Sequence, residues 1–394
     1  MPEEMFITGP DCTDCGCGLP AIAPPLRVTR RPVRRILSRR ATLAIAAKAS
    51  AVSLLLACSP EAGPRPTNTG SSAGASSSST PAAPDTPTSA LRKIDLAFCS
   101  QVLCIVPYEA ARQRGFFAAE GLDVNIVYMR GGAQAMNALL SNSIDWIATP
   151  MDLVVQAAAQ GKNVRMLVST ARLPFFALVS SPKAPDIKDV QHLAGKKIGV
   201  AAVGTTDQLL ARYLLTKAGV DPDSVEWAVL GPNLYDVLLR GQVEAGMVQE
   251  PSLTLLQKAG GKPLVNFMNL KDTEQWLGSA YQFMGLNTRT DVLETQADVG
   301  GKLVRALVKA NQWVLGSPGS RVVDVAPPEI VSGGDIQTFA DAIDRYKVDL
   351  FPADGKIAVD AVQRVLDVQL SSGALKQDAG VKAEDLFTNK FVPS

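Results

Sequence analysis

From residue 91 to about residue 180, short apolar runs alternate with segments whose apolar residues recur every three or four positions. Short apolar runs bounded by turn residues predict strands, and the three-to-four spacing predicts amphipathic helices. The predicted strands are 94–98, 122–129, 144–148 and 164–168, and the predicted helices are 108–120, 132–141 and 153–160. This alternation is typical of an α/β fold with a mainly parallel sheet and right-handed crossovers.

The same alternation restarts after Pro182. It predicts strands at 196–202, 225–230, 245–248 and 263–267, and helices at 206–218, 234–240 and 253–258. After a short extended segment at 281–286, residues 291–375 are rich in helix, with amphipathic stretches at 299–316 and 354–373. Two similar α/β halves followed by a helical return predict a protein of two lobes.

The two lobes are predicted to share the chain unequally. Lobe one would hold residues 91–180 plus 281–394 and is therefore discontinuous, whereas lobe two would hold 181–280. Segments Phe175–Ser180 and Tyr281–Asn287 would link them. Ligands of open α/β sheets lie outside the carboxyl ends of the strands. Two facing lobes therefore predict a ligand cleft between them, which suits capture by hinge closure.

Residues 1–57 are predicted to be a signal region. Within 26–57 a basic stretch precedes a short apolar stretch that Lys48 and a few Ser and Thr interrupt. This is the pattern of an export signal, and it is short for a membrane span, which needs about 20 apolar residues. Residues 38–43, Ser-Arg-Arg-Ala-Thr-Leu, also resemble a twin-arginine signal, so the export route stays open.

The signal region ends in Leu-Leu-Ala followed by Cys58, which resembles the lipobox of bacterial lipoproteins. That resemblance implies that the Cys58 thiol carries the lipid and that the chain is cut just before it. Residues 58–90 are rich in Ser, Pro, Ala and Thr and have almost no large apolar side chains. Such a segment cannot bury enough surface to offset its ordering entropy, so we expect a flexible linker.

Charge is distributed unevenly along the chain. Residues 1–57 hold eight Lys or Arg and four acidic residues, which leaves 31 basic and 34 acidic residues in 58–394. A mildly acidic body gives no electrostatic reason to expect nucleic acid as a partner.

Histidine and cysteine usage narrows the chemistry further. The chain has one histidine, His192, which we expect at the surface or at a helix end, so no metal site of clustered imidazoles is predicted. Cys12, Cys15 and Cys17 form a Cys-x-x-Cys-x-Cys run in the signal region without a Cys or His partner nearby. Cys99 and Cys104 either pair in an exported protein or remain two buried thiols, and the sequence leaves both alternatives open.

Six segments of the body carry a family resemblance. They are ARQRGFFAAEGLDVNIVY (111–128), RGGAQAMNALLSNSIDWI (130–147), HLAGKKIGVAAVGTT (192–206), KAGVDPDSVEW (217–227), GQVEAGMVQEP (241–251) and the C-terminal DG…GALK…DLFTNKFV (354–392). In this order they resemble the solute-binding family that includes sulfonate, taurine and nitrate binders and binders of thiamine-pyrimidine precursors.

The resemblance implies a two-lobed periplasmic-binding-protein-like fold and an extracytoplasmic lipoprotein that captures a small solute for an ABC permease. It implies an anionic or heteroaromatic solute, no cofactor, no metal and a monomer. Yeast-type pyrimidine synthases of the same superfamily consume an active-site histidine and carry a cysteine-rich motif. The predicted first half of lobe one has no histidine, so we expect a binding protein and not an enzyme. A pyrimidine-precursor biosynthetic enzyme or a ligand-sensing module of the same fold remains the alternative.

Candidate ligand residues follow the predicted strands. Gly204, Thr205 and Thr206 join a strand to a helix, where unpaired N–H groups and hydroxyls can bind an anion; the alternative is that the threonines only cap their helix. The other candidates are Ser100, Gln101, Arg130, Gly131, Gly132, Thr149, Asp152, Arg172 and Glu250. Aromatic side chains expected near the cleft are Tyr108, Trp146, Phe175, Phe176, Tyr235 and Tyr281.

Overall fold

The chain divides into two units, Met1–Ala82 and Ala83–Ser394. A computed structural model describes residues 90–99, 103–331 and 336–393, all of which belong to the second unit. The predicted signal region and the lipidation site Cys58 therefore lie outside the described residues. Within the described ranges, no helix combines the length and the apolar composition that crossing a membrane requires.

The first sheet has the strand order β2-β1-β3-β10-β4. β1 runs parallel to β2 and β3, whereas β10 runs antiparallel to β3 and β4. The sheet is buried at its centre, where Leu96 of β1 lies opposite Ile126 and Trp146. Its strands are β1 Arg92–Phe98, β2 Leu122–Tyr128, β3 Trp146–Pro150, β4 Val164–Ala171 and β10 Met284–Arg289.

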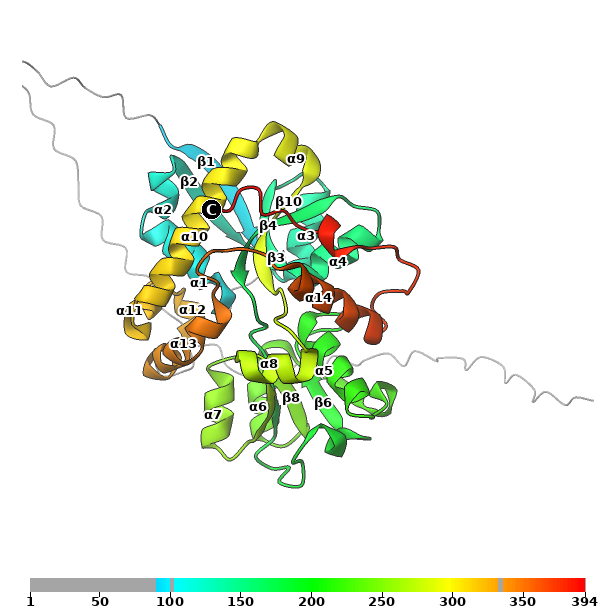
Figure 1. Ribbon diagram of the computed structural model, residues 1–394. Helices are drawn as coiled ribbons and strands as arrows, with labels where there is room; N and C mark the ends of the chain where they lie inside the picture. Colours follow the sequence, from blue (N-terminus) through cyan, green and yellow to red (C-terminus); the bar gives the residue numbers. More distant parts are fainter. Residues whose placement is uncertain (1–89, 100–102, 332–335, 394) are drawn as a thin grey trace, which may run out of the picture. The chain divides into compact units, whose positions relative to one another are not determined.

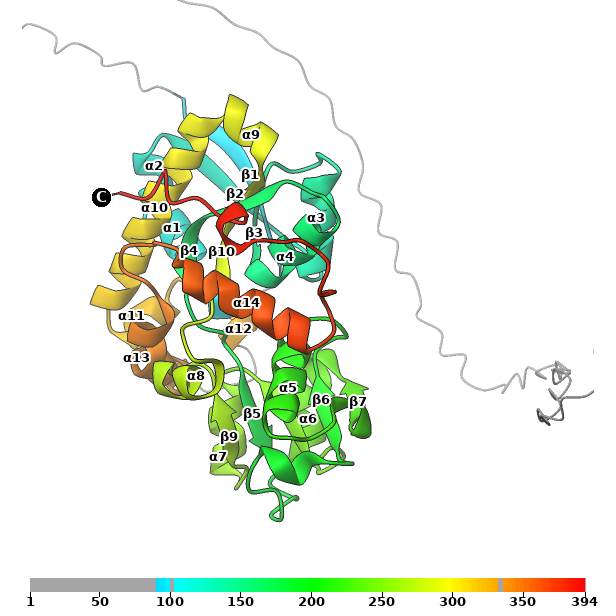
Figure 2. The ribbon, with the colours of Figure 1, turned by 45° about the vertical axis from the view of Figure 1, so that its right-hand side comes forward.

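Helices pack on both sides of the first sheet, and together they form lobe one (Figure 2). α10 contacts α1, α2 and β4, while α3 and α4 pack against the middle strands. The single helix predicted over 108–120 is wrong: α1 ends at Gln113 and α2 starts at Phe116, because Gly115 between them adopts a left-handed φ of 75°. The helices are α1 Val106–Gln113, α2 Phe116–Ala119, α3 Gly132–Leu140, α4 Met151–Ala159, α9 Thr290–Thr295 and α10 Ala297–Gly316.

The second sheet, with its helices, forms lobe two and has the order β7-β6-β8-β5-β9. β6 runs parallel to β7 and β8, whereas β5 runs antiparallel to β8 and β9. The strands are β5 Ala177–Ser180, β6 Lys197–Val200, β7 Glu226–Val229, β8 Ala245–Val248 and β9 Pro263–Asn266. The helices are α5 Thr206–Lys217, α6 Leu234–Leu239, α7 Ser252–Lys258 and α8 Leu270–Leu277.

Both sheets follow one plan. In each, the fourth place is taken by an antiparallel strand that the chain enters on crossing from the other lobe: β5 on the way out and β10 on the way back (Figure 1). The outgoing link was predicted over 175–180, but β5 already belongs to the second sheet, so that crossing is complete before Ala177. The α/β class, the two lobes and the mainly parallel sheets are confirmed.

The C-terminal helices return to lobe one. α14 (Val359–Ser371) contacts both α4 of lobe one and α5 of lobe two (Figure 2). Arg212 of α5 donates through Nε to the Ser372 carbonyl at the end of α14, at 3.1 Å. The remaining elements are α11 Gly319–Val323, α12 Pro328–Val331, α13 Ile336–Leu350, and the short 3-10 helices η1 Leu103–Ile105, η2 Val190–Leu193, η3 Pro222–Ser224, η4 Gly231–Asn233 and η5 Ala383–Asp385.

Candidate functional site

A cleft of about 960 Å³ lies between the two lobes. Segments that follow the carboxyl ends of parallel strands line it: 130–133 after β2, 150–153 after β3, 201–207 after β6 and 231–235 after β7. This is where open α/β sheets bind ligands. Cys99 and Cys104 complete the wall on the lobe-one side, and Phe176, Phe283 and Met284 come from the segments that link the lobes.

The lobe-two wall is a loop, residues 201–205, that the first turn of α5 holds in place. Asp207 accepts from the Ala201 N–H through Oδ2 at 2.6 Å, and Gln208 accepts from the Gly204 N–H through Oε1 at 2.8 Å. Gly204 has a φ of 75°, which side-chain-bearing residues rarely adopt. These bonds present Val203 to the cleft with 72% of its surface exposed. An apolar side chain is therefore available to contact a bound solute.

The two threonine hydroxyls of this junction point to carboxylates. Thr206 donates through Oγ1 to Oδ2 of Asp152 at 3.0 Å, and this bond joins lobe two to lobe one. Thr205 donates to Oδ1 of Asp207. A hydroxyl has one hydrogen to donate, so neither threonine in this arrangement can also donate to an anionic ligand.

Asp152 is fully buried at the base of the cleft, where it also accepts from the Tyr281 hydroxyl at 2.6 Å. Burial raises the pKa of Asp152 to about 6, and the nearby charge of Asp207 adds to this rise, while the hydrogen bonds from Tyr281 and Thr206 oppose it. Burial likewise raises the pKa of Asp207. Two carboxylates therefore stand at the N-terminus of α5, where the sequence predicted an anion site.

The lobe-one wall contains the predicted segment Arg130–Gly132. Gly132 opens α3, and a Cβ at this position would lie 2.5 Å from Cδ1 of Leu153, so the close approach of the helix to α4 favours glycine. Arg130 is exposed, and its backbone N–H donates to Oε1 of Gln134 at 2.8 Å. Among the described residues that line the cleft, Arg130 is the one cationic side chain.

Three candidates lie outside the cleft and have structural partners. Thr149 is fully buried and accepts from Nδ2 of Asn287 at 3.0 Å. Arg172 donates to the carbonyls of Val348 and Asp349 and so caps the C-terminal end of α13.

Glu250 is the third of these candidates. It accepts from the backbone N–H and the hydroxyl of Thr254 at the start of α7, both at 3.0 Å. Burial raises the pKa of Glu250. Ser100 and Gln101 lie outside the described residues.

The aromatic candidates separate into two groups. Phe176 and Tyr235 line the cleft, as expected. Tyr108, Trp146, Phe175 and Tyr281 are at most 2% exposed and belong to the core. His192 is exposed in η2 beside Asp189, which confirms the prediction of a surface residue at a helix end.

Several cleft residues were not among the candidates. Asp207 follows the predicted Gly-Thr-Thr junction directly, and a carboxylate in the first turn of a helix was a signal that could have identified it. Phe283 lies inside the predicted return link. Gly231 and Pro232 follow β7, so the strand-end rule that selected the other junctions would have included them.

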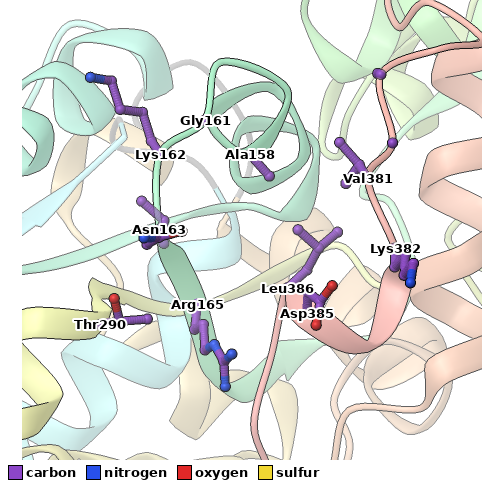
Figure 3. Close-up of a pocket in the computed structure, with 13 residues that line it drawn as sticks. Ala158, Gly161, Lys162, Asn163, Arg165, Thr290, Val381, Lys382, Asp385 and Leu386 are labelled. Atoms are coloured by element: carbon purple, nitrogen blue, oxygen red, sulfur yellow. The ribbon is translucent and has the colours of Figure 1, made fainter.

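A second hollow, of about 520 Å³, lies at the opposite end of β4 from the link to lobe two. Figure 3 shows its wall, which comes from the turn before β4, the start of β4 and the segment around η5. Lys162, Arg165 and Lys382 line it together with Asp385. It contains none of the predicted ligand residues and lies away from the carboxyl ends of the parallel strands, so the inter-lobe cleft is the candidate site.

The sequence of the body matches the model of the NMT1/THI5-like family over residues 104–320. The chain belongs to this family. Among its curated relatives is YtlA of Bacillus subtilis, which is named as a binding protein; it is 24% identical over 266 residues, 65% of this chain and 76% of YtlA. Another is 4-amino-5-hydroxymethyl-2-methylpyrimidine phosphate synthase THI13 of Saccharomyces cerevisiae, 25% identical over 54% of this chain and 64% of the yeast protein.

Several solved structures share the fold of this NMT1/THI5-like chain. A protein of Bordetella bronchiseptica superposes with a TM-score of 0.68 at 24% identity, over 76% of this chain and 95% of that one. The periplasmic nitrate-binding protein NrtA of Synechocystis gives 0.61 at 15% identity, over 76% and 87% of the two chains. The aliphatic sulphonate-binding protein SsuA of Escherichia coli gives 0.57 at 17% identity, over 75% and 91%. The periplasmic-binding-protein fold expected from the sequence is confirmed.

Proposed function

We propose that this protein is an extracytoplasmic solute-binding protein that captures a small heteroaromatic solute carrying an amino group. The observation that carries the proposal is the cleft itself, whose walls are strand ends of both lobes. Binding at such a position contacts both lobes at once, so a solute that fits stabilises their closure. The volume of about 960 Å³ suits a small organic molecule with room for water.

The solute class follows from what lines the cleft. Phe176, Tyr235 and Phe283 offer aromatic faces that can pack against a flat ring. Asp152 and Asp207 line the cleft as buried carboxylates whose oxygens each accept one bond from a protein donor, which leaves further lone pairs that can accept from an amino group. The sequence left an anionic and a heteroaromatic solute open, and of these two classes the residues favour a heteroaromatic ring that carries an amino group. The name of THI13 points to an aminopyrimidine as the first compound to test.

Delivery to an ABC permease and attachment to the membrane are part of the proposal. The basic and apolar signal region, Cys58 and the linker 58–90 support a lipoprotein in the periplasm or on the outer cell surface. We propose that it acts as a monomer, because closure of its own two lobes completes the cleft. Lipidation at Cys58 would hold the protein near the permease that receives the solute.

We propose binding without turnover. The synthase names among the relatives raise the alternative of an enzyme; for such chemistry the cleft lining holds carboxylates and two buried thiols but, among the described residues, no histidine. The one histidine of the chain is His192, which stands at the surface of η2 and outside the cleft lining.

The proposal is tested by thermal shift and calorimetry of the full chain with 4-amino-5-hydroxymethyl-2-methylpyrimidine, an aliphatic sulfonate and nitrate. At about 1,000 times its Kd, a true ligand stabilises the protein by about 4 kcal/mol. We expect this with the pyrimidine and not with the two anions. Stabilisation by an anion alone would contradict the proposed class, and chemical conversion of the pyrimidine would contradict binding without turnover.

Matched variants connect the binding to the cleft. Tyr235→Ala should weaken pyrimidine binding at least tenfold, since loss of a stacked aromatic face costs about 1.4 kcal/mol or more. Tyr213→Ala removes a partly buried tyrosine of α5 outside the cleft lining and should leave the Kd unchanged. Equal effects of the two variants would place the ligand elsewhere.

The membrane anchor is tested separately. Cys58→Ser should leave the chain without lipid label and release it from the membrane fraction, because one acyl-accepting thiol is lost. Normal lipid labelling of this variant would refute the anchor and leave the ligand proposal intact.

A further inference from the structure

Two cysteines stand together in the wall of the cleft. Cys99 follows the last residue of β1, and Cys104 lies in η1, the turn that leads into α1. Both are buried, at 8% and 4% exposure, and both line the cleft. The thiols stand as separate groups joined by a hydrogen bond from one to the other.

The surrounding residues hold the two segments that carry the thiols close to each other. Phe98, next to Cys99, packs edge-on against Tyr108, one helical turn beyond Cys104, with ring centroids 5.1 Å apart. The Tyr108 hydroxyl lies 3.2 Å from Oγ1 of Thr170 in β4, which fixes the start of α1 over the sheet. The end of β1 and the start of α1 are therefore held together by packing that does not involve the sulfur atoms.

We propose that Cys99 and Cys104 form a disulfide bond in the exported protein, and that this bond is part of the ligand cleft wall. The proposal rests on the extracytoplasmic location given under the proposed function. Oxidising compartments favour disulfides between cysteines whose side chains already face each other. Two S–H bonds break and one S–S bond forms, while two protons and two electrons pass to a disulfide-bearing oxidant, which is reduced to a dithiol.

The disulfide would lie in the cleft wall, where it would affect the binding of a solute. A Cβ on Gly132 would lie 3.8 Å from Cβ of Cys99, so the disulfide would lie under the Arg130–Gly132 segment. It would tie the end of β1 to the helix that follows, and thereby stiffen the lobe-one wall that a solute contacts. Burial of both sulfur atoms shields the bond from reductants once the protein is folded.

Burial also sets when the bond forms. It raises the pKa of the Cys104 thiol well above its ordinary value, and the thiolate is the form that reacts with an oxidant. Oxidation is therefore expected while the exported chain folds, and slow exchange is expected afterwards. A chain that folds in a reducing compartment should keep both thiols.

The test uses the full chain, exported to its own membrane, then unfolded in denaturant without reductant so that buried thiols become accessible, and blocked with N-ethylmaleimide in that state. Trypsin releases residues 94–112 as one peptide that contains Cys99 and Cys104 and no other cysteine. We expect this peptide without maleimide from the exported protein, and with two maleimides after reduction. Two maleimides on the peptide from the unreduced, exported protein would overturn the proposal.

Control variants separate the disulfide from the fold. Cys104→Ser should give a peptide with one maleimide under both conditions. Reduction should lower the Tm of the wild-type protein by a few degrees and leave the Tm of a C99A/C104A double variant unchanged; equal shifts of the two proteins would contradict the bond. Because the peptide mass does not depend on any ligand, a disulfide in a protein that binds no solute would refute the proposed function alone.

Discussion

Asp152 links the two lobes through a buried carboxylate, and replacing it by Asn tests this arrangement. Asn keeps the shape of the side chain, so its amide can still meet the hydroxyls of Thr206 and Tyr281. The replacement removes the group whose charge the protein buries at neutral pH. The two proteins should therefore differ in how their stability depends on pH.

The sign and size follow from the pKa. In the unfolded chain Asp152 titrates near 3.8, whereas burial raises its pKa in the folded protein to about 6. The charged form is thus disfavoured by folding, and the contribution of Asp152 to the stability of the wild-type protein falls as the pH rises from 4 to above 6. A difference of about 2 pH units corresponds to about 3 kcal/mol in all, of which about 1.4 kcal/mol falls between pH 5 and pH 7.5.

Urea unfolding of both proteins, followed by tryptophan fluorescence and circular dichroism between pH 5 and pH 7.5, measures this difference. Glu250 also has a raised pKa, but it is unchanged in the variant, so its contribution largely cancels. The charge of Asp207 acts on Asp152 and is part of the effect that is measured. Relative to wild type, Asp152→Asn should gain about 1.4 kcal/mol on going from pH 5 to pH 7.5. The exposed Asp123 of β2, changed to Asn, supplies a control that should show no such gain.

A constant difference between wild type and Asp152→Asn across this range would refute the reasoning. It would mean that the carboxylate has its ordinary pKa, and hence that water reaches it. The hydrogen bond from Thr206 would then be exposed to water, and solvent would reach the base of the cleft at Asp152.

Further variants test the close approaches and caps described above. Gly319→Ala should lower stability by about 1–3 kcal/mol, because the added Cβ would lie 2.0 Å from the Ala340 carbonyl oxygen. In Gly316→Ala the added Cβ meets nothing within 4 Å, so this variant should raise stability by up to about 1 kcal/mol. Urea midpoints in the reverse order would contradict this packing. Arg172→Ala should lower stability by about 1–3 kcal/mol, because α13 loses its cap, and should leave the solute Kd unchanged. A tenfold rise in Kd would instead place this guanidinium at the ligand. Thr206→Val should raise the pKa of Asp152 further, because the lost bond favoured the charged carboxylate, and an unmoved midpoint in the pH series would argue against the contact.

The sequence was a good guide wherever local pattern decides structure. Apolar periodicity located the helix at 206–218 to within a residue or two and the strand at 245–248 as observed. The helix predicted over 108–120 failed because its apolar spacing continues through Gly115, and only the left-handed φ of that glycine shows the break. The outgoing link was misplaced because an apolar strand carries no mark of the sheet that it joins.

The candidate site shows a different limit. Strand-end reasoning placed Arg130, Gly131, Gly132, Gly204 and Thr205 at the cleft, since the edge of a parallel sheet is a property of the fold. The same reasoning included Thr149, which lies within β3, and Glu250, which follows β8, and both side chains are buried in the interior. Which way a side chain turns depends on its partners, and the partner of Thr149 is Asn287, 138 residues away.

Contacts between residues far apart in the chain also change the expected solute from an anion to a molecule with an amino group. A Gly-Thr-Thr junction at a helix start offers a partial positive charge and two hydroxyl donors, which by themselves favour an anion. Asp152 lies 54 residues earlier in the chain and reaches the junction only because the lobes pack together, and with Asp207 it takes both hydroxyl hydrogens. An anionic solute at this point would meet two carboxylates and no spare threonine hydroxyl donor, whereas an amino group would find acceptors. The polarity of the site is thus a property of the contact between lobes, and a solute that carries a donor is the one whose binding would strengthen that contact.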